Sequence, residues 1–157
     1  MTNTIYNQYD SRWASQRIGN SSLTIGRQGC ALCAMCIALG KFGITISPSE
    51  MAKRADWFTS GGLIIWNRVQ EGLKKLYPNK SISTYRYYGR NDKAIQQSLK
   101  PGSAVLLQVA NESHWMVAER KQWLRNDYNC SDSWGGVSRS SIGDYGSITG
   151  YVIIKIT

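Results

Sequence analysis

The sequence predicts an α+β fold in which helices come first and strands come last. Residues 30–42 form an apolar run of helical length, and residues 82–156 hold several short runs typical of antiparallel strands. The chain has 157 residues, of which 42% are hydrophobic and 18% charged, which fits a globular domain and excludes a disordered or collagen-like chain. We therefore expect a single domain over residues 1–157, with a central N-terminal helix packed on an antiparallel sheet.

Three helices are expected in the first half of the chain. Residues 1–29 read as irregular, because glycine and asparagine interrupt any helical period. Residues 30–42 are apolar around nearly the whole helix circumference, as in a helix buried at the centre of a domain. Ser-Pro-Ser-Glu at 47–50 is a capping box for a short helix. Apolar residues recur at helical spacing over 65–76, and Pro78 ends that helix.

The second half of the chain is expected to supply the sheet. Residues 82–88 alternate loosely as a strand, and Asn91 can cap a short helix that follows it. Pro101-Gly102 then turns the chain into the run Ala-Val-Leu-Leu-Gln-Val at 104–109, which reads as a buried strand. The strands after this turn are expected at residues 104–109, 115–120, 128–132 and 151–156.

The net charge of +9 is concentrated in the middle third of the chain. Residues 51–100 carry ten basic and three acidic side chains, so seven of the nine charges lie there. Such a surface attracts anionic partners, although an ordinary solvated Lys/Arg face explains it equally well. Residues 85–90 (Tyr-Arg-Tyr-Tyr-Gly-Arg) mix aromatic and basic side chains as nucleic-acid grooves do, and a strand edge accounts for them equally. We expect no specific nucleic-acid binding.

The first residues carry no targeting signal. Residues 1–20 lack the basic region and the apolar run of about 7–15 residues that a secretory signal needs, and no later run approaches the ~18 apolar residues of a membrane span. We therefore expect a chain that is synthesised in the cytoplasm without a signal peptide and that has no membrane span. Its four cysteines are then expected to be thiols. The sequence leaves the oligomeric state open.

Cys30 is the candidate nucleophile. It follows Gly29 and begins the central helix, where unpaired N–H groups and the helix dipole favour a thiolate and lower the thiol pKa. Its own N–H can point at a developing oxyanion. The alternative is a thiol that merely starts a buried helix.

The other cysteines are expected to be inert. Cys33 and Cys36 lie inside the apolar helix and read as small buried side chains. With the distant Cys130 they also suggest a metal or iron–sulfur site. However, thiols three residues apart step round a helix by about 300° each and cannot converge on one ion without unwinding it. We expect no metal and no cofactor.

His114 and Asp132 are the candidate acid–base pair. His114 is the only histidine, so imidazole catalysis falls to it alone, although a histidine that merely edges a strand would look the same. Asp132 follows 18 positions later at the end of a short extended piece and could hold the imidazole tautomer from a neighbouring strand. The alternative for Asp132 is a residue that starts a glycine-rich turn.

The whole pattern resembles the C39-like family of papain-fold cysteine peptidases. The N-terminal match is Gln-Tyr-Asp-Ser-Arg-Trp-Ala at 8–14, Ile-Gly at 18–19, and Thr-Ile-Gly-Arg-Gln-Gly-Cys-Ala-Leu at 24–32. The family pattern there is Q-x-D-x-R-W followed by G-C-A/T. Later blocks are similar at residues 48–50, 61–66, 101–105, 113–117 and 150–152, so the resemblance covers nearly the full chain.

The resemblance implies a papain-like fold and a catalytic set. It makes Cys30 the nucleophile, His114 the base, Asp132 the residue that orients the base, and Gln8 the side chain of the oxyanion hole, with Gln28 as its rival. The family usually has proline where this chain has Ser133, so the turn after the acid is less rigid here. Trp115 and Trp134 suit a cleft wall or the core equally.

The implied reaction is acyl transfer through a thioester, with no metal or cofactor. The expected substrate is a peptide, and we favour the stem or cross-bridge of peptidoglycan, reached by cell lysis or from a virion that carries the enzyme. One alternative is a cytosolic protein-processing or leader-peptide peptidase. Another is a catalytically silent binding module, because a fold does not guarantee an activity.

Overall fold

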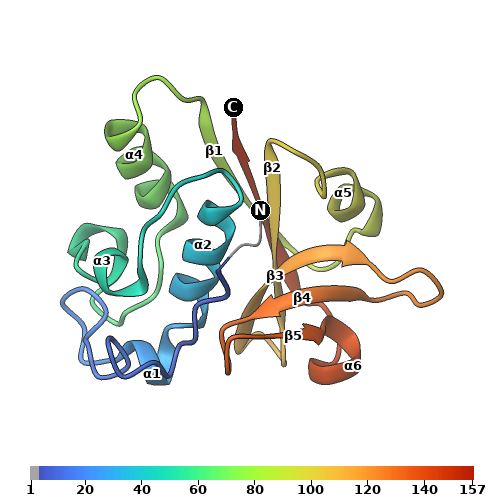
Figure 1. Ribbon diagram of the computed structural model, residues 1–157, viewed down its shortest axis with the longest axis horizontal. Helices are drawn as coiled ribbons and strands as arrows, with labels where there is room; N and C mark the ends of the chain where they lie inside the picture. The colour runs from blue at the N-terminus through green and yellow to red at the C-terminus, as the bar shows by residue number, and fades with distance from the viewer. Residues whose placement is uncertain (1–3) are drawn as a thin grey trace.

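A six-stranded antiparallel sheet runs through the molecule, and helices cover both of its faces (Figure 1). The computed structural model describes residues 4–157, so residues 1–3 of the predicted domain lie outside the described residues. The strand order is β1-β6-β2-β3-β4-β5. The strands are β1 (Ile82–Tyr88), β2 (Ser103–Val109), β3 (His114–Lys121), β4 (Tyr128–Asp132), β5 (Val137–Ser140) and β6 (Gly150–Ile156).

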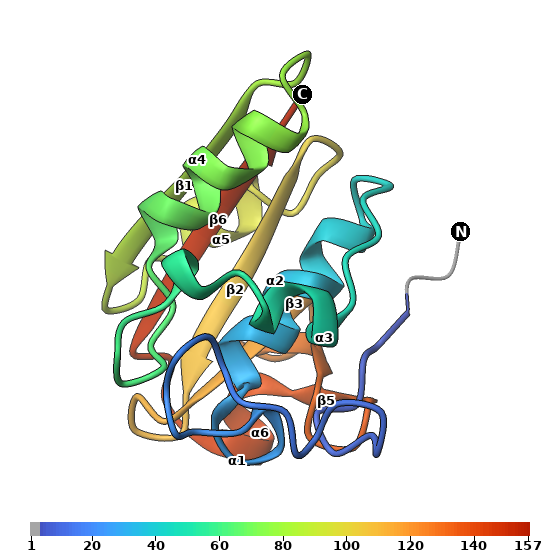
Figure 2. The same cartoon turned by 90° about the vertical axis from the view of Figure 1, so that its left-hand side faces the viewer.

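The helices divide between the two faces of the sheet. One face packs against α2, α3 and α4, and the other packs against α5 and α6 (Figure 2). In the part of the chain that the structure describes, no helix is long and apolar enough to cross a membrane. The helices are α1 (Ile25–Gln28), α2 (Cys30–Gly40), α3 (Pro48–Ala52), the 3₁₀-helix η1 (Ala55–Trp57), α4 (Trp66–Leu76), α5 (Asp92–Gln97) and α6 (Ser141–Tyr145).

Successive residues of the central strands pack into two separate hydrophobic cores, one on each face of the sheet. Leu106 of β2 packs beneath α2, whereas Leu107 packs on the side of α5 and α6. Val117 and Met116 of β3 divide in the same way. Because successive side chains of a strand point to opposite faces, a strand covered on both sides is apolar at every position. This explains why residues 104–109 are apolar except for Gln108.

The predicted central helix is confirmed. Nine of the eleven residues of α2 are buried, and the helix ends at Gly40, two residues before the expected end. The capping box of α3 is also present: the Ser47 hydroxyl accepts a hydrogen bond from the Glu50 N–H at 3.1 Å. Every predicted strand forms, with bounds within one residue of those expected.

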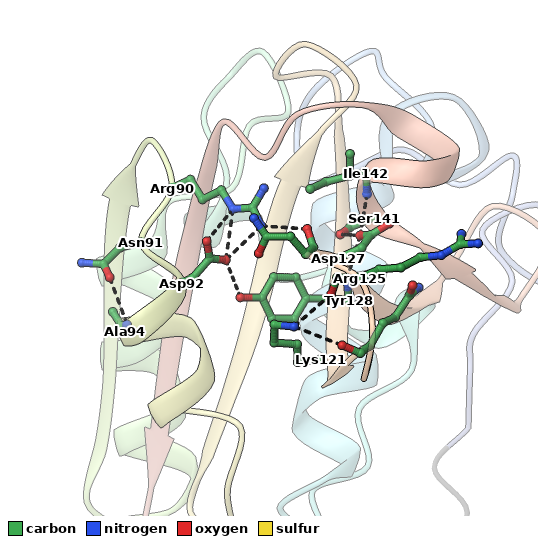
Figure 3. A network of polar contacts seen from close by, with 12 residues as sticks. Arg90, Asn91, Asp92, Ala94, Lys121, Arg125, Asp127, Tyr128, Ser141 and Ile142 are labelled. Atoms are coloured by element: carbon green, nitrogen blue, oxygen red, sulfur yellow. Dashed lines mark hydrogen bonds and ion pairs between the residues drawn. The ribbon is translucent and has the colours of Figure 1, made fainter.

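Four short elements were missed: α1, η1, β5 and α6. The prediction that residues 1–29 are irregular is wrong over α1. Strand β5 has no buried alternation, since three of its four residues are exposed. Helix α6 begins where Asp127, far back in the sequence, accepts hydrogen bonds from the N–H groups of Ile142 and Gly143 at 2.8 and 2.9 Å (Figure 3). Such a distant cap leaves no local signal in the sequence.

The contact between α4 and η1 gives a stability prediction. A methyl group at Gly72 would lie 2.3 Å from Nε1 and 2.4 Å from Cζ2 of Trp57, which is buried. We expect Gly72→Ala to lower the free energy of unfolding by about 1–3 kcal/mol, the usual cost of overpacking a core. Chemical denaturation measures this. Gly40→Ala is the matched control, because its methyl group meets nothing within 4 Å, and equal destabilisation of both variants would contradict the prediction.

Candidate functional site

Cys30 lies at the first position of α2, at the wall of a cavity of about 350 Å³. The residue is buried, and its thiol donates to the Ser113 carbonyl oxygen at 3.9 Å. The cavity is also lined by Gln28, Trp66 and Trp115. The sulfur therefore lies within reach of a molecule bound in this cavity.

The predicted lowering of the Cys30 pKa is wrong in this conformation. Burial raises the pKa of the thiol, and the backbone N–H groups of Trp115, Ala31 and Cys30 only partly offset that effect. The helix N-terminus favours a thiolate, but packing α2 against β3 removes water from the thiol, and this desolvation has the larger effect. The resting state therefore holds a neutral thiol.

The other three cysteines lie in the core. Cys33 and Cys36 belong to the cluster beneath α2, and Cys130 belongs to the cluster on the opposite face of the sheet. All four are free, and burial raises the pKa of Cys33, Cys36 and Cys130. Within residues 4–157 no group of three or more His, Cys, Asp or Glu side chains is arranged to hold a metal ion.

His114 and Asp132 are joined by a buried hydrogen bond. His114 begins β3 and Asp132 ends the adjacent antiparallel strand β4, so the two residues lie at the same end of this pair of strands. The His114 Nε2 and Asp132 Oδ1 atoms are 2.8 Å apart, and both side chains are fully buried. Because a carboxylate only accepts hydrogen bonds, we infer that Nε2 carries the proton. The Nδ1 atom has no hydrogen-bond partner within residues 4–157.

Four donors surround the Asp132 carboxylate. Besides His114, the Trp134 N–H donates to Oδ1 at 2.8 Å, Arg139 Nε lies 3.1 Å from Oδ2, and the Tyr145 hydroxyl donates to Oδ2. Burial alone would raise the pKa of Asp132, but the hydrogen bonds from His114, Tyr145 and Trp134 hold it below its usual value. The carboxylate is therefore a fixed negative charge behind the imidazole.

Aromatic rings fix the orientation of the imidazole. The His114 ring stacks on Trp134 with centroids 3.7 Å apart, and Tyr145 lies against it at 4.9 Å. Trp115 instead lines the Cys30 cavity, where its ring meets the edge of Trp66 at 5.4 Å. Trp134 thus packs on the imidazole, and Trp115 forms a wall of the cavity.

Cys30 and His114 converge without a hydrogen bond between them. The thiol contacts the Ser113 carbonyl oxygen, and the Trp115 N–H faces the sulfur, so the backbone on both sides of His114 borders Cys30. His114 is in turn bonded to Asp132 on β4. Residues from three distant parts of the sequence therefore share one site.

The two candidate oxyanion glutamines have different surroundings. Gln8 is buried: its Nε2 donates to the Gly26 carbonyl at 3.1 Å, and its Oε1 accepts from the Ser133 hydroxyl at 3.0 Å. Gln28 ends α1, is exposed, and lines the Cys30 cavity. Gln8 therefore ties the N-terminal segment to the residue after Asp132, whereas Gln28 faces the space that a ligand would fill.

The contacts of Arg86 and Gln108 near the cavity were not predicted from the sequence. Arg86 on β1 lines the cavity, and its Nη2 donates to Gln108 Oε1 at 2.8 Å. The Gln108 Nε2 in turn donates to the Glu112 carbonyl oxygen at 3.2 Å, in a turn where Ala110, Asn111 and Glu112 have φ of 52°, 53° and 71°. Three successive left-handed residues without a glycine are strained, and such strain gathers at functional sites.

The reactivity of the four thiols can be measured directly. We expect a limiting amount of iodoacetamide to label Cys30 first, because it is 9% exposed and the others are at most 1% exposed. Since the Cys30 pKa is raised, the labelling rate should rise about tenfold per pH unit from about pH 6 to 8 as the thiolate fraction grows. Peptide mapping by mass spectrometry gives both results. A rate independent of pH would instead indicate a thiolate already paired with protonated His114.

The fold is similar to that of a protease of known structure. One similar solved structure is the crystal structure of a double glycine motif protease from an AMS/PCAT transporter in complex with the leader peptide. The TM-score is 0.54 at 15% sequence identity, over 82% of this chain and 84% of that chain. No protein-family model and no curated protein match the sequence. The likeness therefore identifies the architecture, a mixed helix and antiparallel-sheet fold similar to a C39 peptidase domain.

Proposed function

We propose that this protein is a cysteine peptidase that hydrolyses amide bonds through Cys30, His114 and Asp132. The observation that carries the proposal is the His114 ring, whose Nε2 is bound to the buried Asp132 carboxylate and whose Nδ1 has no hydrogen-bond partner in the part of the chain that the structure describes. An imidazole held in one tautomer with a free basic nitrogen is what a general base requires. It lies beside Cys30, which borders a ligand-sized cavity at a helix N-terminus.

The reaction begins when the thiol exchanges its hydrogen bond to the Ser113 carbonyl for one to His114 Nδ1. As Nδ1 takes the proton, the sulfur attacks the carbonyl carbon of the substrate amide and forms a tetrahedral intermediate. The Cys30 N–H and the amide of Gln8, or of its rival Gln28, stabilise the oxyanion. His114 then gives the proton to the leaving amine, and water hydrolyses the thioester.

We also propose that the chain belongs to the C39-like family of papain-fold peptidases as one domain over residues 1–157. Two observations support this. The Gln8, Cys30, His114 and Asp132 positions follow the order of the family motifs, and the fold is similar to that of a double glycine motif protease. One rests on short motifs and the other on the path of the backbone.

The substrate that we favour is a peptide bond in the stem or cross-bridge of peptidoglycan. The support is the excess of basic residues over 51–100, which favours approach to an anionic envelope through long-range attraction. A leader peptide is the second candidate, because the similar protease was crystallised with one.

One experiment separates these substrates. Purified sacculi of several wall types, and peptides that carry a double glycine motif, are incubated with wild type and with Cys30→Ala, and new amino termini are identified by mass spectrometry. We expect wild type alone to release new termini from sacculi. Cleavage of the double glycine peptides alone would favour leader processing. If neither substrate is cut although Cys30 labels readily, a binding module becomes the better description.

A further inference from the structure

The loop between β3 and β4 exposes a tryptophan and a leucine side by side. Trp123 is 90% exposed and Leu124 is 81% exposed, and they are adjacent at the tip. The β3–β4 hairpin extends away from the rest of the molecule at this end (Figure 1). Burying a tryptophan and a leucine is normally favourable, so their placement at a projecting tip requires a reason.

The tip is held in this conformation by hydrogen bonds to its backbone. The Gln122 N–H donates to the Asp127 carbonyl oxygen at 2.9 Å and closes the loop. Lys121 Nζ donates to the Arg125 carbonyl oxygen at 2.9 Å, and Arg90 Nη2 donates to the Asn126 carbonyl oxygen at 3.0 Å (Figure 3). The apolar pair is therefore presented by an ordered loop, which lowers the entropy lost when a partner binds.

Cations flank the apolar tip on both strands of the hairpin. Arg120 and Lys121 precede it and Arg125 follows it, and none of the three forms an ion pair within residues 4–157. The nearby carboxylates are already engaged. Asp92 accepts from Arg90 and from the Tyr128 hydroxyl, and Asp127 caps α6 (Figure 3). The tip thus combines an aromatic ring, an aliphatic side chain and uncompensated positive charge.

We propose that this hairpin tip, defined by Arg120, Lys121, Trp123, Leu124 and Arg125, docks on an anionic phospholipid surface. Tryptophan favours the boundary between lipid and water, leucine favours the acyl region, and lysine and arginine attract acidic headgroups. A protein groove would accept the apolar pair equally well, but three cations without an ion pair within residues 4–157 favour a surface that is negative throughout.

The geometry leaves the Cys30 cavity open while the tip is bound. His114 begins β3 and Lys121 ends it, so at about 3.4 Å per residue the tip lies roughly 24 Å along the strand from the imidazole. Docking therefore holds the protein at a membrane without covering the proposed active site.

Vesicle co-sedimentation of the full chain tests the proposal. We expect wild type to bind vesicles of phosphatidylglycerol and phosphatidylcholine at least tenfold more tightly than vesicles of phosphatidylcholine alone, with the difference reduced at high salt. Trp123→Ser/Leu124→Ser should lose at least tenfold in binding to both vesicle types. Arg120→Gln/Arg125→Gln should lose binding to the acidic vesicles only, by about tenfold or more for two charges.

Tyr88→Ser is the matched control, since Tyr88 is 83% exposed on β1 and lies outside the tip. Thermal melts check that every variant is folded. The proposal is overturned if wild type does not bind acidic vesicles, or if the Trp123→Ser/Leu124→Ser variant binds them as wild type does. A change in self-association without vesicle binding would assign the tip to a protein contact instead, and would overturn it as well.

Discussion

Cys30→Ala is expected to lower the rate of amide hydrolysis by about 10⁵-fold or more, because loss of the nucleophile leaves only the weak catalysis of the oxyanion hole and of binding. His114→Ala should cost nearly as much. The chain has no second histidine that could replace it, and the buried Asp132 would lose its partner at 2.8 Å. The substrate for these assays is the one identified by amino-terminal mapping, and kcat/KM is the measured quantity.

Cys33→Ala is the control for these variants. Cys33 lies one turn further along α2 and is fully buried, so the change removes a thiol from the same helix without touching the cavity. We expect it to keep the wild-type kcat/KM and to lose some stability, as a small core truncation does. If His114→Ala were folded and fully active, the proposed mechanism would fail, since no other imidazole is present.

Asp132→Asn carries the second large effect, which falls on both activity and stability. The amide cannot accept from all the donors around the carboxylate, and its NH₂ would face either Nε2 of His114 or the Tyr145 hydroxyl and Arg139. The imidazole then loses the partner that fixes its proton on Nε2. We expect kcat to fall by about 10³–10⁴-fold, as in other triads that lose the orienting carboxylate.

The stability cost of Asp132→Asn has the same origin. Buried donors without an acceptor destabilise the fold by about 1–3 kcal/mol each. Chemical denaturation and the pH dependence of kcat measure the two effects separately. Tyr145→Phe removes one donor and keeps the ring against His114, so it should cost much less than Asp132→Asn in both measurements. A Tyr145→Phe variant as inactive as Asp132→Asn would mean that the hydroxyl, and not the carboxylate, orients the base.

Much of the fold follows from local sequence. Helix α2 could be predicted because its residues are apolar around the whole circumference, as in a helix that is buried at the centre of a domain. The capping box of α3 and the apolar strand β2 could be predicted for similar reasons, since the signal lies within a few residues. Helix α6 and strand β5 could not, because Asp127 and the edge of β4 create them from outside their own sequence.

The candidate site, like the fold, could be predicted only in part from the sequence. Chain order and residue type indicated Cys30, His114 and Asp132, and the predicted pairing of His114 with Asp132 is present as a hydrogen bond between adjacent strands. Their catalytic roles remain predictions that the variants above test. Gln8 and Gln28 could not be ranked from sequence, because only packing places one inside the protein and the other at the cavity.

Local sequence patterns were enough to predict one central buried helix and an antiparallel sheet, and the composition shows a single imidazole. The electrostatics of the site, in contrast, arise from tertiary packing. Packing α2 against β3 desolvates the Cys30 thiol and raises its pKa, and the fold gathers Trp134, Arg139 and Tyr145 around Asp132. Helix and strand formation depend on neighbours a few residues away, whereas a pKa depends on the solvent and charges that distant segments exclude or supply.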